Sequence, residues 1–309
     1  MKEGKIVFRI LNEQHNAQFI ENDKMILLTF DDNYVDQTIN LIMSILAYNP
    51  ECVFICLCPE LTKENTDKLL QTDGGIKILT LIIDSTIDTK NWPITTIFRV
   101  FAPWILDNTI SDILYMDSDF VCTGDISELL HFVPRYIAMC PEINASVKQN
   151  MLDYFFSVHP LSLYCNAGVV KFNCDSIRSD YTLQQVLDAF WESLQYTHYL
   201  DQDFLNIFFG EKIDIINNFL YNFQAYELLG SPMYEKVIKS CALIHFTIGK
   251  PWNYKTPRTL IKLYYKHTKY DAMKKRMKTV MHKNLIYIIL RSPKKTIESL
   301  CKAIAKGCI

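Results

Sequence analysis

The sequence predicts an α/β fold in which helices flank a mostly parallel central sheet. Short apolar runs alternate with stretches of helical periodicity, polar turns separate them, and acidic clusters follow two of the apolar runs. The chain has 309 residues, of which 49% are hydrophobic, so it is long enough to bury a substantial core. A globular protein is therefore expected.

The alternation is clearest in the first 120 residues. Apolar runs predict strands at 25–30, 52–58, 76–83 and 113–116, and periodicity predicts helices at 35–48, 61–71 and 95–106. Further strands are expected at 136–140, 163–172 and 241–246, and further helices at 181–196, 203–209 and from 263 onward. The early part has the order expected of strand-helix-strand units in a parallel sheet.

Two carboxylates, Asp117 and Asp119, directly follow the strand predicted at 113–116. Neighbouring carboxylates repel each other, so a positive partner is expected. Oxygen ligands suit a hard or borderline divalent ion such as Mg²⁺ or Mn²⁺, which completes its coordination with substrate phosphates. In the alternative interpretation, one aspartate caps the following turn and the other is solvated.

A second acidic cluster, Asp31-Asp32-Asn33, follows the strand predicted at 25–30. Ligands of open parallel sheets lie beyond the carboxyl ends of the strands. We therefore expect this cluster and the Asp117 cluster to converge on one crevice.

The segment YMDSDFV (115–121) also matches the opening motif of haloacid-dehalogenase-like phosphatases. In that interpretation Asp117 is the nucleophile and Asp119 the acid/base. Such phosphatases normally use their first strand for this motif, whereas here a long segment with its own acidic cluster comes first.

His245 ends the apolar run 241–246, and Gly249 and Lys250 follow on a predicted loop. An imidazole, a flexible backbone and an ammonium group are thus available to one metal diphosphate, and imidazole suits Mn²⁺ better than Mg²⁺. A hydrogen-bonded core histidine is the structural alternative. Two further segments contain candidate ligands. Asn166 to Gly168 interrupts a predicted strand with small or amide residues, and Asp201 to Asp203 lies at a helix start. Taken singly, each segment is expected to have a structural role.

Six motifs, taken together and in order, resemble glycosyltransferase family 8: DDNY (31–34), IFRVFAPWIL (97–106), LYMDSD (114–119), NAGVVKFN (166–173), DQDFLN (201–206) and HFTIGKPW (245–252). The resemblance covers about residues 25 to 255. That family contains retaining bacterial lipopolysaccharide galactosyl- and glucosyltransferases and glycogenin relatives. The resemblance implies one Rossmann-like nucleotide-sugar-binding domain of GT-A type at 1–262, and 263–309 then forms a basic helical tail.

The resemblance also implies roles for thirteen residues. The metal ligands for Mn²⁺, with Mg²⁺ as second choice, are Asp117, Asp119 and His245. The residues placed around the UDP-sugar are Thr29, Asp31 and Asn33 for uridine, Arg99 and Ser118 near the donor, and Gly249 and Lys250 for phosphate. The catalytic positions that line the donor sugar are Asn166, Asp201 and Gln202, with Gln202 near the anomeric carbon.

The implied activity is transfer, with retention, of glucose or galactose from UDP-glucose or UDP-galactose to a saccharide acceptor, in lipopolysaccharide core or another cell-surface glycan. The leaving UDP gains negative charge, which Mn²⁺ and Lys250 would neutralise. An amide is a poor nucleophile, so front-face attack is favoured over a covalent intermediate on Gln202. After the strand at 136–140, where the family often carries a sugar-facing aspartate, this chain has Pro141-Glu142, which leaves the choice between glucose and galactose open.

Charge is distributed unevenly along the chain. From Lys262 onward there are 13 Lys and Arg against two acids, whereas the preceding part has 19 against 32. A basic tail is attracted to anionic surfaces, either a membrane or a nucleic acid. The basic stretch 274–278, the apolar stretch 285–290, and then Ile297, Leu300, Cys301 and Ile304 on one helical face predict an interfacial helix on a lipid surface, with a merely solvated basic end as the alternative.

We therefore expect a cytoplasmic protein that lies peripherally on the inner face of the cell membrane, acts there on a saccharide or lipid-linked saccharide acceptor, and has no nucleic-acid partner. No apolar run approaches the roughly 20 residues of a spanning helix, and none at the N-terminus has signal-peptide length. Ten cysteines lie scattered without a CxxC pair, which favours reduced core thiols. A non-catalytic nucleotide-sugar-binding protein stays an alternative, and the absence of a GxG loop disfavours a nucleotidyltransferase.

Overall fold

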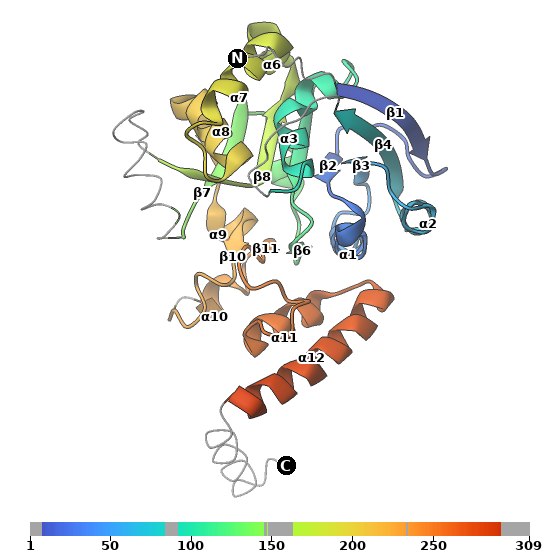
Figure 1. The fold of residues 1–309 in the computed structure, drawn as a ribbon, viewed down its shortest axis with the longest axis vertical. Helices are drawn as coiled ribbons and strands as arrows, with labels where there is room; N and C mark the ends of the chain where they lie inside the picture. The colour runs from blue at the N-terminus through green and yellow to red at the C-terminus, as the bar shows by residue number, and fades with distance from the viewer. Residues whose placement is uncertain (1–7, 84–91, 145–146, 148–162, 233, 292–309) are drawn as a thin grey trace, which may run out of the picture.

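An eight-stranded mixed sheet forms the centre of the molecule (Figure 1). The structure, a computed structural model, describes residues 8–83, 92–144, 147, 163–232 and 234–291. The strands lie in the order β1-β4-β3-β2-β5-β8-β7-β9. Their bounds are Phe8–His15 (β1), Met25–Thr29 (β2), Val53–Cys58 (β3), Gly75–Ile83 (β4), Asp112–Met116 (β5), Ile137–Pro141 (β7), Cys165–Asn173 (β8) and Ile213–Ile215 (β9).

The centre of this sheet is the predicted parallel part. Strands β4, β3, β2 and β5 are parallel neighbours, connected by helices α1 (Val35–Leu46), α2 (Lys63–Leu70) and α3 (Thr95–Ile105). Because β2 and β5 run side by side in the same direction, their carboxyl ends meet at one edge of the sheet. The acidic segments that follow the two strands therefore converge, as predicted.

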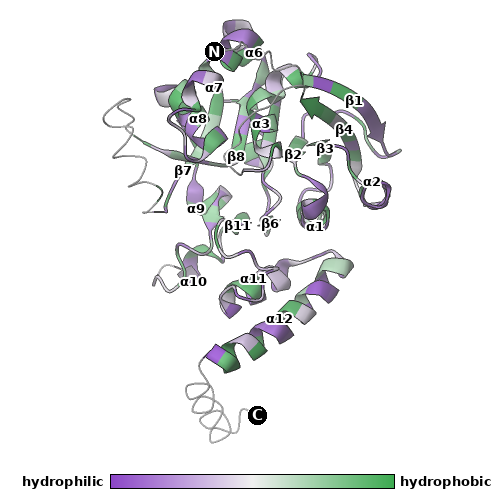
Figure 2. Ribbon diagram, in the orientation of Figure 1, coloured by the Kyte–Doolittle hydropathy of each residue, from purple (hydrophilic) through white to green (hydrophobic). Residues whose placement is uncertain are grey.

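The central strands are buried on both faces. Ile26 and Leu28 pack with Ile39 of α1 on one face, whereas Leu27 packs with Phe98 of α3 on the other. A strand covered on both faces needs apolar side chains at every position, which explains the continuous apolar runs. The strands at the centre of the sheet are correspondingly coloured largely as hydrophobic in Figure 2.

The other half of the sheet is largely antiparallel. Strand β8 runs antiparallel to both β5 and β7, and β9 adds a short parallel edge. Helices α6 (Cys174–Asp180), α7 (Leu183–Ser193) and α8 (Leu200–Phe209) follow β8 in the chain. Aromatic rings hold α3, α7 and α8 together: Phe190 meets Phe101 and Phe204 with ring centroids 5.4 and 5.2 Å apart.

A second, three-stranded sheet of order β10-β11-β6 lies beside the first. Its strands are β6 (Phe120–Cys122), β10 (Phe223–Gln224) and β11 (Leu243–His245). Only the β11 region was predicted as a strand, since β6 and β10 are too short to give a periodic signal. The single-turn helical segments η1 (Asp32–Tyr34), α4 (Ser127–His131), η2 (Gly210–Lys212), α9 (Asn218–Tyr221) and α10 (Tyr234–Val237) complete the connections.

The C-terminal part is helical, as predicted, and forms α11 (Arg258–His267) and α12 (Asp271–Arg291). Their buried side chains, including Tyr264, Met273 and Met277, pack with Val121 and Phe246 of the small sheet region. The expected boundary between residues 262 and 263 lies within α11. The apolar end of α12 stays exposed at Leu285, Ile286, Ile289 and Leu290. The predicted apolar positions from Ile297 to Ile304 lie outside the described residues.

Strand β1 was missed by the sequence analysis, which placed no strand before residue 25. Its sequence FRILNEQH is mostly exposed, and Phe8 packs against the core beside Phe101, so the strand lacks the continuous apolar run that revealed the others. It forms because its backbone pairs antiparallel with the edge of β4. The strand that carries the Asp117 pair is consequently the fifth strand of the chain and not the fourth.

All eight cysteines in the described part of the chain are buried and unpaired. Burial raises the pKa of thiols such as Cys52, to about 12, and so keeps them unreactive. A search of the described helices finds none with the length and apolar character needed to cross a membrane.

Candidate active site

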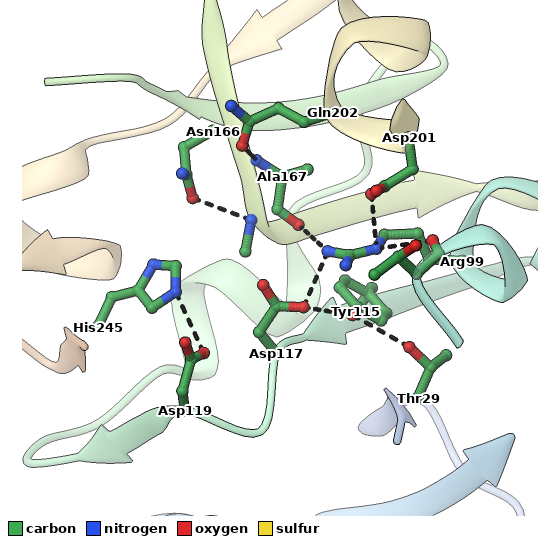
Figure 3. Close-up of polar contacts among 12 residues, drawn as sticks. Thr29, Arg99, Tyr115, Asp117, Asp119, Asn166, Ala167, Asp201, Gln202 and His245 are labelled. Carbon is green, nitrogen blue, oxygen red and sulfur yellow. Dashed lines mark hydrogen bonds and ion pairs between the residues drawn. The ribbon is translucent and has the colours of Figure 1, made fainter. Parts of the chain in front are cut away.

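The two sheets bring together the three predicted metal ligands. Asp117 follows β5, Asp119 immediately precedes β6, and His245 ends β11, where it pairs with Phe120 of β6. Ligand atoms of the two carboxylates and the imidazole all lie within 4.8 Å of one another (Figure 3). Pairing between β6 and β11 thus places a histidine from far along the chain beside the acidic pair.

One carboxylate oxygen of Asp117 is held by side chains of α3 and β5. Its Oδ1 is 2.8 Å from an Arg99 guanidinium nitrogen and accepts a hydrogen bond from the Tyr115 hydroxyl. That hydroxyl also lies 3.2 Å from Thr29 Oγ1, on the neighbouring strand β2. Because both contacts go to Oδ1, the second oxygen of this partly exposed side chain keeps lone pairs for a ligand.

Asp119 is buried between two basic groups. Lys250 Nζ bonds Oδ2, and His245 Nε2 lies 3.2 Å from Oδ1. Burial opposes the charged carboxylate, but Lys250 and His245 outweigh it and hold the pKa of Asp119 below its ordinary value. In the same way, burial opposes the charged amine of Lys250, and Asp119 nevertheless raises the pKa of Lys250. Both groups are therefore charged at neutral pH.

Packing fixes the plane of the His245 ring. Phe120 stacks on the imidazole with ring centroids 3.9 Å apart and an interplanar angle of 19°. Gly168 of β8 lies against the same ring, because a Cβ atom there would come within 2.3 Å of His245 Cε1. The ring of His245 is therefore held in one orientation, and position 168 beside it has room only for glycine.

The donor set fits a divalent cation. Oδ1 of Asp119 is buried and accepts no hydrogen bond from the described residues, although it faces His245 Nε2. Two carboxylates and one imidazole are ligands that Mn²⁺ accepts, and Mg²⁺ accepts the carboxylates more readily than the imidazole. A cation bound among these atoms would satisfy the buried Asp119 oxygen.

Arg99 and Asp201 form a buried pair beside the metal ligands. Asp201 Oδ2 is 2.9 Å from Arg99 Nε, but that N–H donates to the Thr96 carbonyl, so the carboxylate receives charge without a well-aligned hydrogen bond. Burial consequently raises the pKa of Asp201 to about 7 in spite of the arginine. Arg99 also donates to the Ala167 carbonyl, at 2.8 Å.

Gln202 lies in the first turn of α8, with both ends of its amide held. Its Oε1 accepts from the Ala167 N–H at 3.0 Å, and its Nε2 donates to the Tyr164 hydroxyl at 3.0 Å. Helix α8 begins at Leu200, three residues earlier than predicted, and Leu200 has a φ of 39°, an uncommon left-handed conformation for such a residue. This turn places Asp201 toward Arg99 and Gln202 toward β8 (Figure 3).

Asn166, which the resemblance places at the donor sugar, is hydrogen-bonded to Glu142. Asn166 Nδ2 donates to Glu142 Oε2 at 2.8 Å, and Asn166 Oδ1 accepts from the Gly168 N–H. Glu142 Oε1 accepts from the Asn144 N–H. Both side chains are buried, so their polar atoms are already partnered within the protein.

The remaining predicted residues surround this centre. Asp31 accepts hydrogen bonds from the Asn33 backbone and side chain, and Ser118 shares a hydrogen bond of 2.8 Å with Thr38 of α1, so its hydroxyl is turned toward that helix. Gly249 has a φ of +66°, a left-handed conformation that favours glycine in the loop before Lys250.

Several functional neighbours were missed by sequence reasoning. Tyr115 shares a strand face with Asp117, two residues on, so the period of two in a strand could have indicated it. Tyr34 stands between the acidic groups, where burial raises its pKa and Lys250 opposes the shift. Asn222 accepts from or donates to His245 Nδ1 across 2.8 Å, and nothing in the pattern around residue 222 marks it.

Comparison with known proteins gives consistent matches. Lipopolysaccharide 1,2-glucosyltransferase of Escherichia coli is 27% identical over 246 residues, which cover 72% of this chain and 71% of that protein. Lipopolysaccharide 1,3-galactosyltransferase of Salmonella typhimurium is 27% identical over 267 residues, which cover 77% and 75%. The crystal structure of galactosyltransferase LgtC with donor and acceptor sugar analogues superposes with a TM-score of 0.65 at 17% identity, covering 82% of this chain and 99% of that one.

The fold is that of GT-A type glycosyltransferases, and an acidic pair lies at the carboxyl end of one of its central strands. The chain belongs to glycosyl transferase family 8, whose model matches residues 25–256. The resemblance found in the sequence is thereby confirmed, and the phosphatase interpretation of Asp117 is set aside.

Proposed function

We propose that this protein is a Mn²⁺-dependent hexosyltransferase that moves glucose or galactose, with retention, from a UDP-sugar to a saccharide acceptor. The observation that carries the proposal is the cluster of Asp117, Asp119 and His245 in a member of this family. Two relatives are named as lipopolysaccharide glucosyl- and galactosyltransferases, so we place the acceptor in lipopolysaccharide core or a related cell-surface glycan.

Asp117, Asp119 and His245 would hold the cation, which when bound supplies positive charge to the diphosphate of the leaving UDP. Lys250 lies beside the Asp119 carboxylate and is itself positively charged. In our proposal its ammonium group contacts both Asp119 and a phosphate of the donor. The left-handed turn at Gly249 brings backbone N–H groups close to the same phosphate. Thr29, Asp31, Asn33 and Ser118 belong to the donor side of this site.

We assign Asp201 and Gln202 to the donor-sugar side. Gln202 is held at both ends of its amide, so it offers a fixed dipole and not a mobile nucleophile. An amide oxygen carries no negative charge, which favours front-face attack by the acceptor hydroxyl over a covalent intermediate. Arg99 keeps Asp117 and Asp201 apart, because its guanidinium lies between the two carboxylates.

A donor panel tests the proposal most directly. Purified protein is incubated with UDP-glucose, UDP-galactose and other UDP-sugars in the presence of Mn²⁺, Mg²⁺ or a chelator, and UDP release is measured. We expect Mn²⁺-dependent release from UDP-glucose or UDP-galactose, with the α-anomer of the sugar retained in the transferred product. Binding of UDP with Mn²⁺ but no release from any donor would instead indicate a non-catalytic nucleotide-sugar-binding protein.

We also propose that the C-terminal helices attach the enzyme to the inner face of the cell membrane. The last turns of α12 expose Leu285, Ile286, Ile289 and Leu290 next to a strongly basic stretch. Apolar residues beside lysines are typical of helices that lie in a lipid interface. Residues 1–262 with α11 would then be the catalytic part, and α12 with the following residues would be the anchor.

Replacing these four apolar residues of α12 by serine should weaken binding to vesicles that contain anionic phospholipid by about tenfold or more, which corresponds to ~1.4 kcal/mol. Vesicle sedimentation measures the binding, and UDP-sugar hydrolysis in solution should persist. The control replaces the exposed Leu11 and Ile20, far from the tail in sequence, by serine. If the α12 variant and the control bind vesicles equally well, the membrane proposal fails.

A further inference from the structure

Four buried side chains form a hydrogen-bonded chain that ends at the proposed metal ligand His245. Glu142 Oε2 accepts from Asn166 Nδ2 at 2.8 Å, Asn166 Oδ1 accepts from Asn222 Nδ2 at 3.0 Å, and Asn222 Oδ1 lies 2.8 Å from His245 Nδ1. None of the four is more than 6% exposed. The chain joins the end of β7 to β8, to the residue after α9, and to β11.

The hydrogen bonds of this chain run in one direction. A carboxylate only accepts, so Glu142 turns the NH₂ group of Asn166 toward itself and the Asn166 oxygen away. The Gly168 N–H donates to that same oxygen at 3.0 Å and fixes the amide independently. Asn222 must then present its NH₂ group to Asn166 and its oxygen to His245. Consequently Nδ1 of His245 carries a proton and donates it to Asn222.

The opposite tautomer would close the site. With a proton on Nε2, neutral His245 would point that proton toward Asp119 Oδ1, which lies 3.2 Å away, and would have no lone pair there for a cation. Phe120 and Gly168 set the plane of the ring, but packing against carbon atoms does not choose between the two tautomers. The choice requires a polar partner at Nδ1, and Asn222 is placed to be that partner.

We propose that Asn222, oriented by Asn166 and Glu142, is a positioning residue that fixes the tautomer of His245 and so keeps Nε2 available to a divalent cation. The inference deepens the proposed function, on which it rests for the presence of that cation. Asn166 and Glu142 then act through the metal side of the site and not through contact with the donor sugar. Partners of this kind orient metal-bound histidines in many proteins, and their loss typically weakens metal affinity about 10–100-fold.

Mn²⁺ binding to the full chain, followed by electron paramagnetic resonance without nucleotide or sugar, tests this. Asn222→Leu should bind Mn²⁺ about 10–100-fold more weakly than wild type. Asn222→Asp keeps an acceptor opposite Nδ1 and should recover most of the affinity. In Glu142→Gln, either amide orientation makes two NH groups face each other, at Asn166 or at the Asn144 N–H, so a smaller loss is expected.

The matched control is Asn49→Leu. Asn49 is also a buried asparagine with hydrogen bonds at both ends of its amide, to Ile126 and Gly124, but it contacts none of the metal ligands. The Asn49→Leu substitution should lower the unfolding temperature, while the Mn²⁺ affinity stays at the wild-type value. Equal Mn²⁺ affinities for Asn222→Leu and Asn49→Leu would overturn the proposal, as would a failure of Asn222→Asp to bind better than Asn222→Leu.

A spectroscopic measurement reads the tautomer itself. In metal-free protein labelled with ¹⁵N at histidine, His245 should show a protonated Nδ1 in the wild type and a mixture of tautomers in Asn222→Leu. A wild-type Nε2–H tautomer would overturn the inference. Neither measurement involves a UDP-sugar, so a protein that passes both but releases no UDP in the donor panel contradicts the proposed function and not this inference.

Discussion

The two sheets contribute to the candidate site in different ways. On the large-sheet side, Arg99 lies between Asp117 and Asp201, and the Ala167 backbone holds both Arg99 and Gln202. Most polar atoms there already have partners, and Asp201 Oδ2, which accepts no hydrogen bond, is paired with the charge of Arg99. On the small-sheet side, Asp119 keeps a buried oxygen that accepts no hydrogen bond from the described residues and lies 3.2 Å from His245 Nε2.

This difference indicates how the site divides its work. A network of partnered groups is rigid before a ligand arrives, which suits the binding of a sugar in one orientation. Acceptors that face each other in a buried place are stable only with a cation or a proton between them. We therefore expect substitutions on the small-sheet side, and at Asp117 where the two sides meet, to act first on metal binding. Other substitutions on the large-sheet side should act first on stability and on sugar handling.

Asp119→Asn should have the largest effect and tests the small-sheet side. It keeps the shape of the side chain but removes the negative charge that holds Lys250 and would hold a cation. Because even outer-shell changes cost about 10–100-fold, we expect Mn²⁺-dependent UDP-sugar hydrolysis to fall by at least about 100-fold.

The control for this variant is Asp188→Asn, an exposed position on α7, which should leave hydrolysis unchanged. If Asp119→Asn keeps Mn²⁺-dependent hydrolysis at the wild-type rate, the small-sheet side does not control metal binding, and the division of the site is wrong.

Gly168→Ala should have the next largest effect, because Gly168 is where the large sheet touches the small-sheet ligands. The added Cβ would stand 2.3 Å from His245 Cε1 and 2.9 Å from Nδ1, so the imidazole must shift. Overpacking of this kind costs about 1–3 kcal/mol of unfolding free energy, and we expect Mn²⁺ affinity to fall about tenfold as well. Chemical denaturation and metal titration measure the two effects.

Gly124→Ala is the matched control for this change, because its Cβ would meet Ala242 at an ordinary 3.5 Å. If Gly168→Ala loses stability but binds Mn²⁺ as tightly as Gly124→Ala, the position of the His245 ring does not control Mn²⁺ affinity, and the expected effect of the small-sheet side on metal binding is wrong.

The sequence predicted the elements and residues whose signal is local. Continuous apolar runs predicted β2 to β5, and the two aspartates at a strand end pointed to the proposed metal site, because burial and charge repulsion act on neighbours in the chain. Partners that depend on long-range pairing could not be predicted. Asn222 meets His245 only because β10 pairs with β11, and the side chain of Asn166 turns toward Glu142 because β7 and β8 are adjacent.

Asp201→Asn should have the smallest effect on metal binding, and it sharpens the account of the large-sheet side through the pH dependence of stability. Burial raises the pKa of Asp201 from 3.8 to about 7, so between these values the folded protein keeps a proton that the unfolded chain has lost. The unfolding free energy of the wild type should therefore fall, relative to Asp201→Asn, by up to about 1.4 kcal/mol per pH unit as the pH rises from about 4 to about 7, and stay level above that.

Denaturation curves of the two proteins at a series of pH values measure this difference directly. The asparagine keeps an oxygen for Arg99 and has no proton to lose, so unaffected groups cancel in the comparison. Parallel pH profiles for wild type and variant would mean that Arg99 keeps Asp201 ionised throughout. The large-sheet side would then hold two carboxylates against one guanidinium and, like the small-sheet side, would depend on the positive charge of a ligand.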